Sequence, residues 1–274
     1  MPQTAALELA REPSELLAAA LRPVRDLQLY VQVEDETADG GWIADADLLD
    51  PLSPASQALI ERFGPYGFAA NKKAAAASLL LRFGWASGPA IALFLLDRRI
   101  LRVRSYALRF SASSLLQGLS IRSADVSPPR PADDGVHREL VEALAAFTEP
   151  VVEAYHQWSH FSRHALWAMA TSSWAAQFAN IGAQTGSSAA CLDHVQSLFE
   201  AAPHEVQRAA PEIYPVTEGE LFCTCQKRAS CCLYFKAPQR EFCASCPIIP
   251  KAERLDRNLD WLRAGHGASR EATA

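Results

Sequence analysis

Four cysteines near the C-terminal end of the chain constrain its structure more than any other feature. Cys231, Cys232, Cys243 and Cys246 follow the spacing C-C-x10-C-x2-C. Four thiolates brought together form a set of soft ligands, which in proteins hold zinc or an iron–sulfur cluster. The segment around these residues must therefore fold so that two short cysteine pairs converge on one centre.

Length and composition set the outer limits of the fold. The chain has 274 residues, of which 49% are hydrophobic and 21% charged, so it can bury a sizeable core. Charged residues at Glu8, Arg11, Glu12 and Glu15 interrupt any apolar export signal. We therefore expect a cytoplasmic protein, in which clustered cysteines bind metal or carry redox chemistry rather than form disulfides.

One apolar stretch, residues 74–96, raises the question of a membrane span. Arg82 falls inside it, and Gly88-Pro89 would interrupt a helix there, so we expect two buried helical pieces instead. The formal net charge of −5 argues against nucleic acid as a partner, since a protein that binds nucleic acid normally presents a basic face.

Hydrophobic periodicity predicts an α+β fold: a helix-rich body with a small antiparallel sheet, followed by a C-terminal cysteine-rich segment. The expected helices cover residues 12–27, 53–62, 133–200 and 251–263, and the expected strands 27–33, 100–110 and 115–121.

The chain is expected to divide into three parts. These are a body over residues 1–215, a cysteine-containing segment over 216–264, and a flexible tail over 265–274, with a soft boundary near Pro215. Residues 221–264 hold eight Lys or Arg against four acids, so this segment carries +4 and the remainder −9. Nearby cations would stabilise an anionic thiolate site, but from the charge count alone a solvated surface is the favoured explanation of the excess.

The cysteines alone leave three interpretations open: an iron–sulfur cluster, a structural zinc site with four thiolates, and buried cysteines without ligand. The vicinal pair favours a centre with two metal ions, because neighbouring side chains of an extended chain point to opposite faces. Cys223 and Cys225 are expected not to be ligands, since four thiolates already complete either site, and Cys191 is expected to be a core residue.

The segment from Arg228 to Pro247, RASCCLYFKAPQREFCASCP, closely resembles the C-terminal [2Fe-2S] motif of the FhuF-type ferric-siderophore reductases. The resemblance includes the vicinal pair, the ten-residue gap, the CxxC and the proline that follows. More weakly, residues 79–99 with Trp85 resemble the N-terminal region of that family, and residues 149–167 its central helices.

This resemblance implies an oxidoreductase acting on metal ions. Its cofactor would be a [2Fe-2S] cluster held by Cys231, Cys232, Cys243 and Cys246, and its substrate a ferric siderophore reduced by one electron to release iron in the cytoplasm. No G-x-G-x-x-G motif is visible, so the electron is expected from a donor protein or a small reductant. We expect a monomer that sits in the cytoplasm or peripherally at the inner face of the membrane, with transient contact to an inner-membrane siderophore transporter. The alternative is a siderophore-binding or assembly protein with a structural zinc site.

Candidate substrate contacts come from both parts of the chain. They are Lys227, Arg228 and Tyr234 in the cysteine segment and Trp158 and His160 in the body. Lys236 and Arg240 are expected to offset the cluster charge.

Histidines and tryptophans in the body have simpler explanations. His156, His160 and His164 recur every four residues, which on one helix would align three imidazoles; a polar helix face is the simplest reading. The tryptophans are expected to anchor the core: Trp85, Trp158, Trp167 and Trp174.

Overall fold

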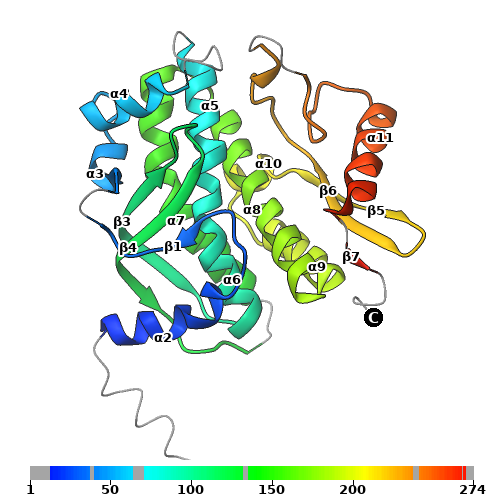
Figure 1. Cartoon of the computed structure of the whole chain (residues 1–274), viewed down its shortest axis with the longest axis horizontal. Helices are drawn as coiled ribbons and strands as arrows, with labels where there is room; N and C mark the ends of the chain where they lie inside the picture. Colours follow the sequence, from blue (N-terminus) through cyan, green and yellow to red (C-terminus); the bar gives the residue numbers. More distant parts are fainter. Residues whose placement is uncertain are drawn as a thin grey trace, which may run out of the picture.

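The computed structural model describes residues 13–37, 40–63, 71–131, 135–236, 241–266 and 268–269. Figure 1 shows a helix-rich body with a twisted sheet on one side and the C-terminal segment, drawn in orange and red, on the other. The α+β fold predicted from the sequence is confirmed. Two expectations concern residues outside the described ranges: the charged residues among the first twelve, and most of the tail beyond residue 266.

The sheet of the body has four strands in the order β1-β4-β3-β2. β3 and β4 form a long antiparallel hairpin close to the ranges predicted for these two strands. β2 pairs antiparallel with β3, whereas β1 pairs parallel with β4, so the sheet is mixed at the β1 edge. Only the last two residues of the predicted strand 27–33 pair with a neighbour. At the end of α2, the Leu27 N–H donates to the Val24 carbonyl oxygen. Leu29 and Val31 then bury their side chains in the core without pairing to a neighbouring strand. The strands are β1 (Gln32–Val33), β2 (Trp42–Ala44), β3 (Leu101–Phe110) and β4 (Leu116–Val126).

Helices cover the sheet and form most of the core. Ser53 caps α4 by accepting a hydrogen bond from the Ser56 N–H, as its position before Pro54 predicts. The body helices are α2 (Pro13–Arg25), α3 (Asp45–Leu48), α4 (Pro54–Glu61), α5 (Lys72–Phe83), η2 (Gly84–Ser87), α6 (Gly88–Asp97), α7 (Gly135–Ser159), α8 (Arg163–Thr185), α9 (Ser188–Glu200) and α10 (His204–Arg208).

The apolar stretch forms α5 and α6, joined by the short 3-10 turn η2. By length and composition, Lys72–Asp97 is the one helical stretch among the described residues that could cross a membrane, but 72% of its most apolar window is buried inside the protein. Gly84 lets this turn approach α8 closely, because a Cβ there would lie 2.8 Å from the Ala170 carbonyl oxygen. We therefore assign the stretch to the core, as two packed helical pieces.

The C-terminal segment has its own small sheet and helix. β5 (Glu212–Glu218) and β6 (Leu221–Lys227) form a hairpin, β7 (Ala268–Ser269) pairs with the start of β6, and α11 (Lys251–Trp261) packs against the hairpin. α11 runs on into one irregular turn, η4 (Leu262–His266). The expected domain boundary near Pro215 falls inside β5. A second hydrophobic core forms between hairpin and helix, built around Val216, Cys223, Cys225 and Leu262.

Candidate metal centre

The four motif cysteines lie in the loops between β6 and α11. Cys231 and Cys232 follow β6 after three residues, and Cys243 and Cys246 precede α11. A tight turn closes the second pair, since the Cys246 N–H donates to the Cys243 carbonyl at 2.9 Å. The Arg228 N–H donates to the Ser245 carbonyl at 3.0 Å, which ties the end of β6 to the second pair. The backbone itself therefore brings the two halves of the motif together.

The chain turns sharply directly after the vicinal pair. Leu233 has a φ of 62°, in the left-handed region that bulky residues seldom adopt, and its N–H donates to the Cys231 sulfur at 3.3 Å. A fully extended chain would send the two neighbouring sulfurs to opposite faces. The turn, continued by the short helix η3 (Tyr234–Lys236), keeps both residues near the second pair.

The thiols of the two pairs influence each other. Interaction with the Cys232 thiol, followed by the nearby Arg228 charge, lowers the pKa of Cys243 to about 5, although burial opposes this. The same interaction raises the pKa of Cys232. Burial raises the pKa of Cys231, and the charges of Cys246 and Cys243 raise it further. Cys243 is therefore a thiolate near neutral pH, the form that binds metal.

Three arginines hold the ligand loop, and one of them, Arg257 on α11, donates to the Phe242 carbonyl oxygen at 2.5 Å. The Arg228 guanidinium lies 3.5 Å from the Cys243 sulfur. Arg254, on α11, is only 5% exposed and donates to the carbonyl oxygens of Cys246 and Ile249 at 3.2 and 3.1 Å. Arg254 was not predicted as a site residue, because a basic residue in an amphipathic helix is expected to be exposed and the sequence does not reveal that this one is buried.

The donor set fits a two-iron cluster. The four motif cysteines are free thiols, so each is available as a ligand. A [2Fe-2S] cluster divides four cysteine ligands between two irons, and the sequence supplies them as two pairs.

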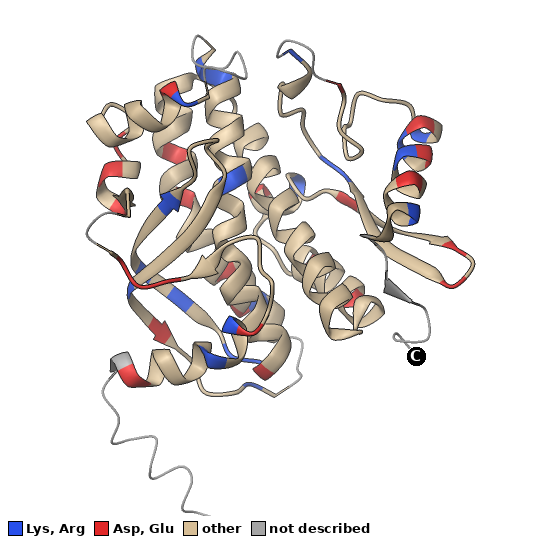
Figure 2. Ribbon diagram, viewed as in Figure 1, with Lys and Arg blue, Asp and Glu red and all other residues tan. Residues whose placement is uncertain are grey.

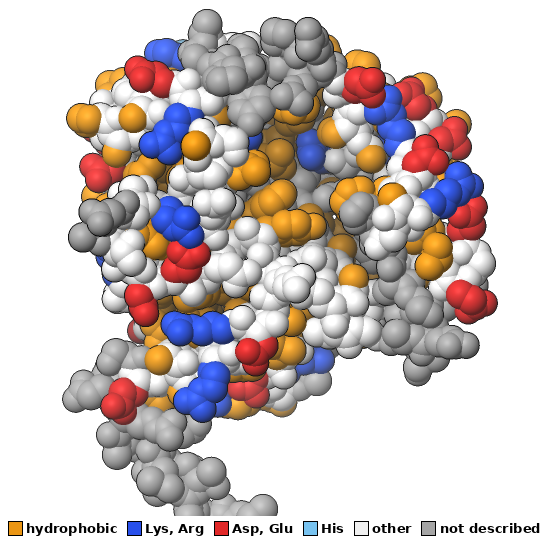
Figure 3. All heavy atoms as spheres, viewed as in Figure 1, with side chains coloured by type: hydrophobic (Ala, Val, Ile, Leu, Met, Phe, Trp, Pro, Cys, Tyr) orange, Lys and Arg blue, Asp and Glu red, His pale blue; other side chains and the backbone are white. Residues whose placement is uncertain are grey.

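A hollow of about 260 Å³ lies over Cys232 and Cys243. Its far wall belongs to the body and includes Leu81, Trp85 and Leu116, and Tyr234 closes the near side. Trp85 is half-buried and packs on Tyr30 at 4.3 Å between ring centroids, so it is not the fully buried anchor expected. Figure 3 shows hydrophobic side chains gathered in the hollowed region between the body and the C-terminal segment.

A larger cavity of about 770 Å³ lies beside the first, between α8, β6 and α11. Arg228 lines both, so its side chain stands between them. Ala244 and Ser245, inside the second cysteine pair, also line the larger cavity.

The structure separates the five candidate substrate residues into two groups. Arg228 and Tyr234 line the hollow over the cysteines. Lys227 instead pairs with Glu212 at 3.2 Å, and Trp158 packs at the end of α7 with the Lys72 ammonium 5.3 Å from its ring centroid. Neither residue, nor His160, lines either cavity. Of the two cations expected beside the cluster, Lys236 is exposed and Arg240 lies outside the described residues.

The expected alignment of three histidines on one helix is wrong. α7 ends at Ser159, His160 takes a left-handed φ of 54°, and α8 begins only at Arg163 with Ser162 as its cap. The cause is local: the Ser162 side chain accepts from the Ala165 N–H and starts a new helix. Trp167 and Trp174, by contrast, are buried as expected.

Cys223 and Cys225 lie on the β6 face that packs under α11, and their sulfurs are 3.2 Å apart. Thr224 and Gln226 lie on the opposite face of β6 and were not singled out from the sequence. Their only signal was the alternation of a strand, which places Thr224, Gln226 and Arg228 on one side.

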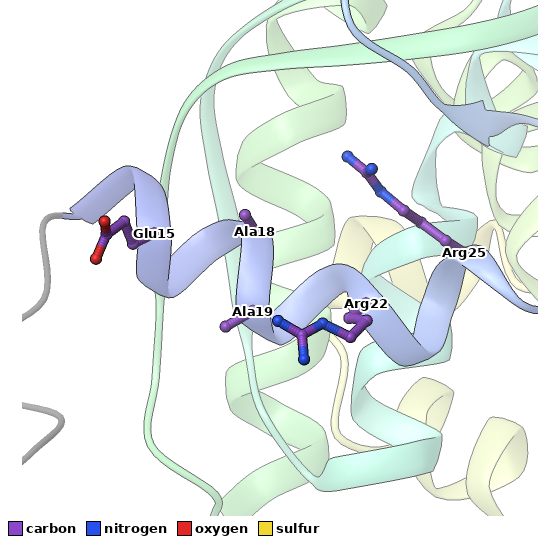
Figure 4. A pocket seen from close by; sticks show the side chains of 5 residues that line it. All are labelled: Glu15, Ala18, Ala19, Arg22 and Arg25. Carbon is purple, nitrogen blue, oxygen red and sulfur yellow. The ribbon is translucent and has the colours of Figure 1, made fainter.

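A further hollow of about 500 Å³ lies along α2, at the end of the molecule away from the cysteines (Figure 1). In Figure 4, Arg22 and Arg25 extend in different directions and do not converge on a common point. The residues that line it offer no thiol, so we place the functional site at the cysteine segment.

Comparison with known families supports this assignment. Residues 228–247 match the family model of the FhuF 2Fe-2S C-terminal domain, and the match spans all four motif cysteines. The weaker resemblances in the body lie outside it. No curated protein and no solved structure matches the chain. Residues 228–247 therefore form a 2Fe-2S C-terminal domain of the FhuF type, whose cofactor is a [2Fe-2S] cluster.

Proposed function

We propose that this protein is a ferric-siderophore reductase, which reduces siderophore-bound Fe(III) to Fe(II) by one electron. The observation that carries the proposal is an FhuF-type set of four cysteines placed where the C-terminal segment faces the body, with cavities on both sides of Arg228. When bound, the [2Fe-2S] cluster supplies electrons one at a time, the number that this reduction needs.

Reduction is a chemically sufficient way to release the iron. Siderophores hold Fe(III) through hard oxygen donors, and a lower metal charge weakens those ion–oxygen bonds. The protein need not break the chelate itself. Its side chains have to bind the complex close to the thiolates and keep the site dry.

The residues around the cysteines are suited to those tasks. Leu81, Trp85 and Leu116 present an apolar wall opposite Cys232 and Cys243, which keeps water from that side of the thiolates. Arg228 stabilises the Cys243 thiolate and stands between the two cavities. Arg254 fixes the backbone of the CxxC turn from α11.

The electron source is external in this proposal. The sequence has no G-x-G-x-x-G motif for a nicotinamide or flavin nucleotide, so a donor protein or a small reductant re-reduces the site. We further propose that the protein acts as a cytoplasmic monomer and transiently meets an inner-membrane siderophore transporter at the inner face of the membrane, so that the imported complex is reduced on arrival.

Anaerobic stopped-flow measurements test the reductase activity. Protein purified without oxygen and analysed for iron and sulfide is reduced with dithionite, freed of excess reductant, and mixed with ferric siderophores. We expect the absorbance of the oxidised protein to return while a ferrous chelator traps Fe(II). Gallium(III) complexes of the same siderophores, which cannot be reduced, should leave the protein reduced. If no ferric siderophore reoxidises protein with an intact spectrum, the proposal fails.

A further inference from the structure

Two cysteines outside the metal motif lie side by side on β6. Cys223 and Cys225 occupy the strand face that packs under α11, and both are free thiols. Their sulfurs are 3.2 Å apart. A cysteine packs like a small apolar residue, so packing explains a single buried thiol but not the contact between two. The contact therefore points to chemistry between the two sulfurs.

The spacing of a strand brings the pair within reach of a disulfide. Residues two apart along a strand have Cα atoms separated by about 6.4 to 6.8 Å. This lies at the long end of the range of roughly 4.4 to 6.8 Å found across disulfides. From their separation of 3.2 Å, the sulfurs must approach by roughly 1 Å more to form the bond. The disulfide is thus accessible but strained, and strained disulfides are readily reduced by other thiols.

The two thiols are chemically different. The hydrogen bond from the Cys225 thiol lowers the pKa of Cys223, although burial opposes this. The same contact, together with burial, raises the pKa of Cys225. Residues 213–226 contain no Lys or Arg, and Figure 2 shows the acids of this hairpin at its two ends, so the partner thiol is the group that stabilises the Cys223 thiolate. Cys223 is therefore the nucleophile of the pair, and Cys225 is placed to resolve its oxidised form.

A small oxidant can reach the pair through the cavity between α8, β6 and α11. Cys223 and Cys225 both line this cavity of about 770 Å³, and each is 8% exposed. Hydrogen peroxide is little larger than water, so it can enter such a space. Ala244 and Ser245, between the ligands of the second motif pair, line the same cavity. A peroxide that enters it therefore meets the thiol pair and the cysteine loop in one space.

We propose that Cys223 and Cys225 are a redox-active dithiol, which reduces a peroxide that enters the cavity and closes to a disulfide within β6. The pair is distinct from the metal ligands, so this inference goes beyond the reductase activity and does not depend on it.

The reaction balances with one peroxide for each pair. The Cys223 thiolate attacks one oxygen of hydrogen peroxide, the O–O bond breaks, and the other oxygen takes up a proton and leaves as water. The Cys225 sulfur then attacks the Cys223 sulfenic acid. The S–O bond breaks, the S–S bond forms, and the hydroxyl leaves with the thiol proton as a second water. Two thiols have then lost two electrons to the peroxide. Two molecules of a small thiol such as glutathione reverse the oxidation by exchange and leave as their own disulfide.

Peptide mapping of wild-type protein tests the site directly. Cluster-loaded protein is treated with a small excess of hydrogen peroxide, blocked with N-ethylmaleimide while it is denatured, and digested with trypsin. The sequence places Cys223 and Cys225 on one peptide, residues 209–227, which has no other cysteine. We expect this peptide to lose two hydrogen atoms and both maleimide labels while the visible spectrum is still present, and glutathione to restore both labels.

Cys191 is the matched control within the same molecule. It is 2% exposed, burial raises its pKa, and it lies on a separate tryptic peptide, residues 164–208. We expect it to react more than about tenfold more slowly, since each unit of pKa changes the thiolate fraction about tenfold. If the visible spectrum bleaches while the 209–227 peptide keeps both labels, or if either cysteine joins a third one instead, the proposal fails and the reductase proposal stands.

Serine variants assign the two roles. In Cys225→Ser the new hydroxyl still donates to the Cys223 sulfur but cannot form a disulfide, so the sulfenic acid should accumulate and be labelled by dimedone. In Cys223→Ser the labelling of Cys225 should be more than about tenfold lower, because this thiol has lost its nucleophilic partner. Equal labelling of the two variants overturns the assigned roles. The wild-type peptide map decides whether the pair reacts, even if a variant folds poorly.

Discussion

Replacing Arg228 by glutamine should lower the reduction potential of the protein. The guanidinium nitrogen lies 3.5 Å from the Cys243 sulfur, and reduction adds one negative charge on the metal side of that sulfur. A cation at this position stabilises the reduced state more than the oxidised one. Without it, the reduced state loses that advantage.

The size of the effect follows from Coulomb's law. Adding a metal–sulfur bond of about 2.3 Å places the new charge about 6 Å from the guanidinium. At that separation a unit pair is worth about 2.8 kcal/mol at an effective dielectric constant of about 20, and about 0.7 kcal/mol in bulk water. For a one-electron couple this corresponds to a fall of roughly 30 to 120 mV. Arg228 is half-buried, so we expect a value inside this range.

Spectroelectrochemical titration of the purified variants measures this shift. Arg228→Lys keeps the charge and should recover most of the potential. Lys227→Gln is the matched control: its ammonium is already paired with Glu212, so its removal should shift the potential by less than about 10 mV. An unchanged or higher potential in Arg228→Gln with a wild-type spectrum, or an equal shift in Lys227→Gln, would refute the reasoning.

Three further results are expected. Cys243→Ser should abolish or reshape the visible absorption of the anaerobically purified protein while Cys223→Ser does not; a wild-type spectrum for Cys243→Ser contradicts the ligand assignment. Burial, with the nearby Arg98 charge, lowers the pKa of His194 from 6.5 to about 4, so protonation opposes folding and stability is lost as the pH falls from 6.5 towards 4. Because His194 is partly exposed to solvent, we expect the free energy of unfolding to fall by only about 1–2 kcal/mol over this pH range. Urea unfolding of the His194→Gln variant across the same range should not show this fall. Gly84→Ala should lower the free energy of unfolding by about 1–3 kcal/mol because its Cβ meets the α8 backbone, and an unchanged urea midpoint would show that the two helices can separate without cost.

Much of the fold follows from local sequence signals. The alternation over residues 100–121 gave the central hairpin, and Ser53-Pro54 marked the start of α4. The cysteine spacing located the metal centre, because the four thiolate ligands lie close together along the chain and their spacing can be read directly from the sequence. The strand expected over residues 27–33 is only two residues long in the structure, because Leu29 and Val31 are buried in the core without pairing to a neighbouring strand.

Long-range pairing was not readable from the sequence. A count of charges gave the C-terminal segment an excess of cations, but Lys227, Arg257 and Arg263 are engaged in ion pairs with acids. Arg228, Arg254 and Arg257 contact the cysteine loop, the first at the Cys243 sulfur and the other two at backbone carbonyl groups. Which cation meets an acid and which meets a sulfur depends on how β6 and α11 pack, and composition carries no information about that packing.

The hydrogen bonds from Arg254 have a consequence for the lifetime of the protein. A buried guanidinium on α11 is satisfied by carbonyl groups of the CxxC turn, so the helix and the turn keep their places together. When the cysteines lose their metal and the turn loosens, the buried Arg254 loses the carbonyl groups that it is bonded to, a cost that favours release of the helix. We therefore expect protein that has lost its metal to be cut near its C-terminal end by proteases more readily than metal-loaded protein.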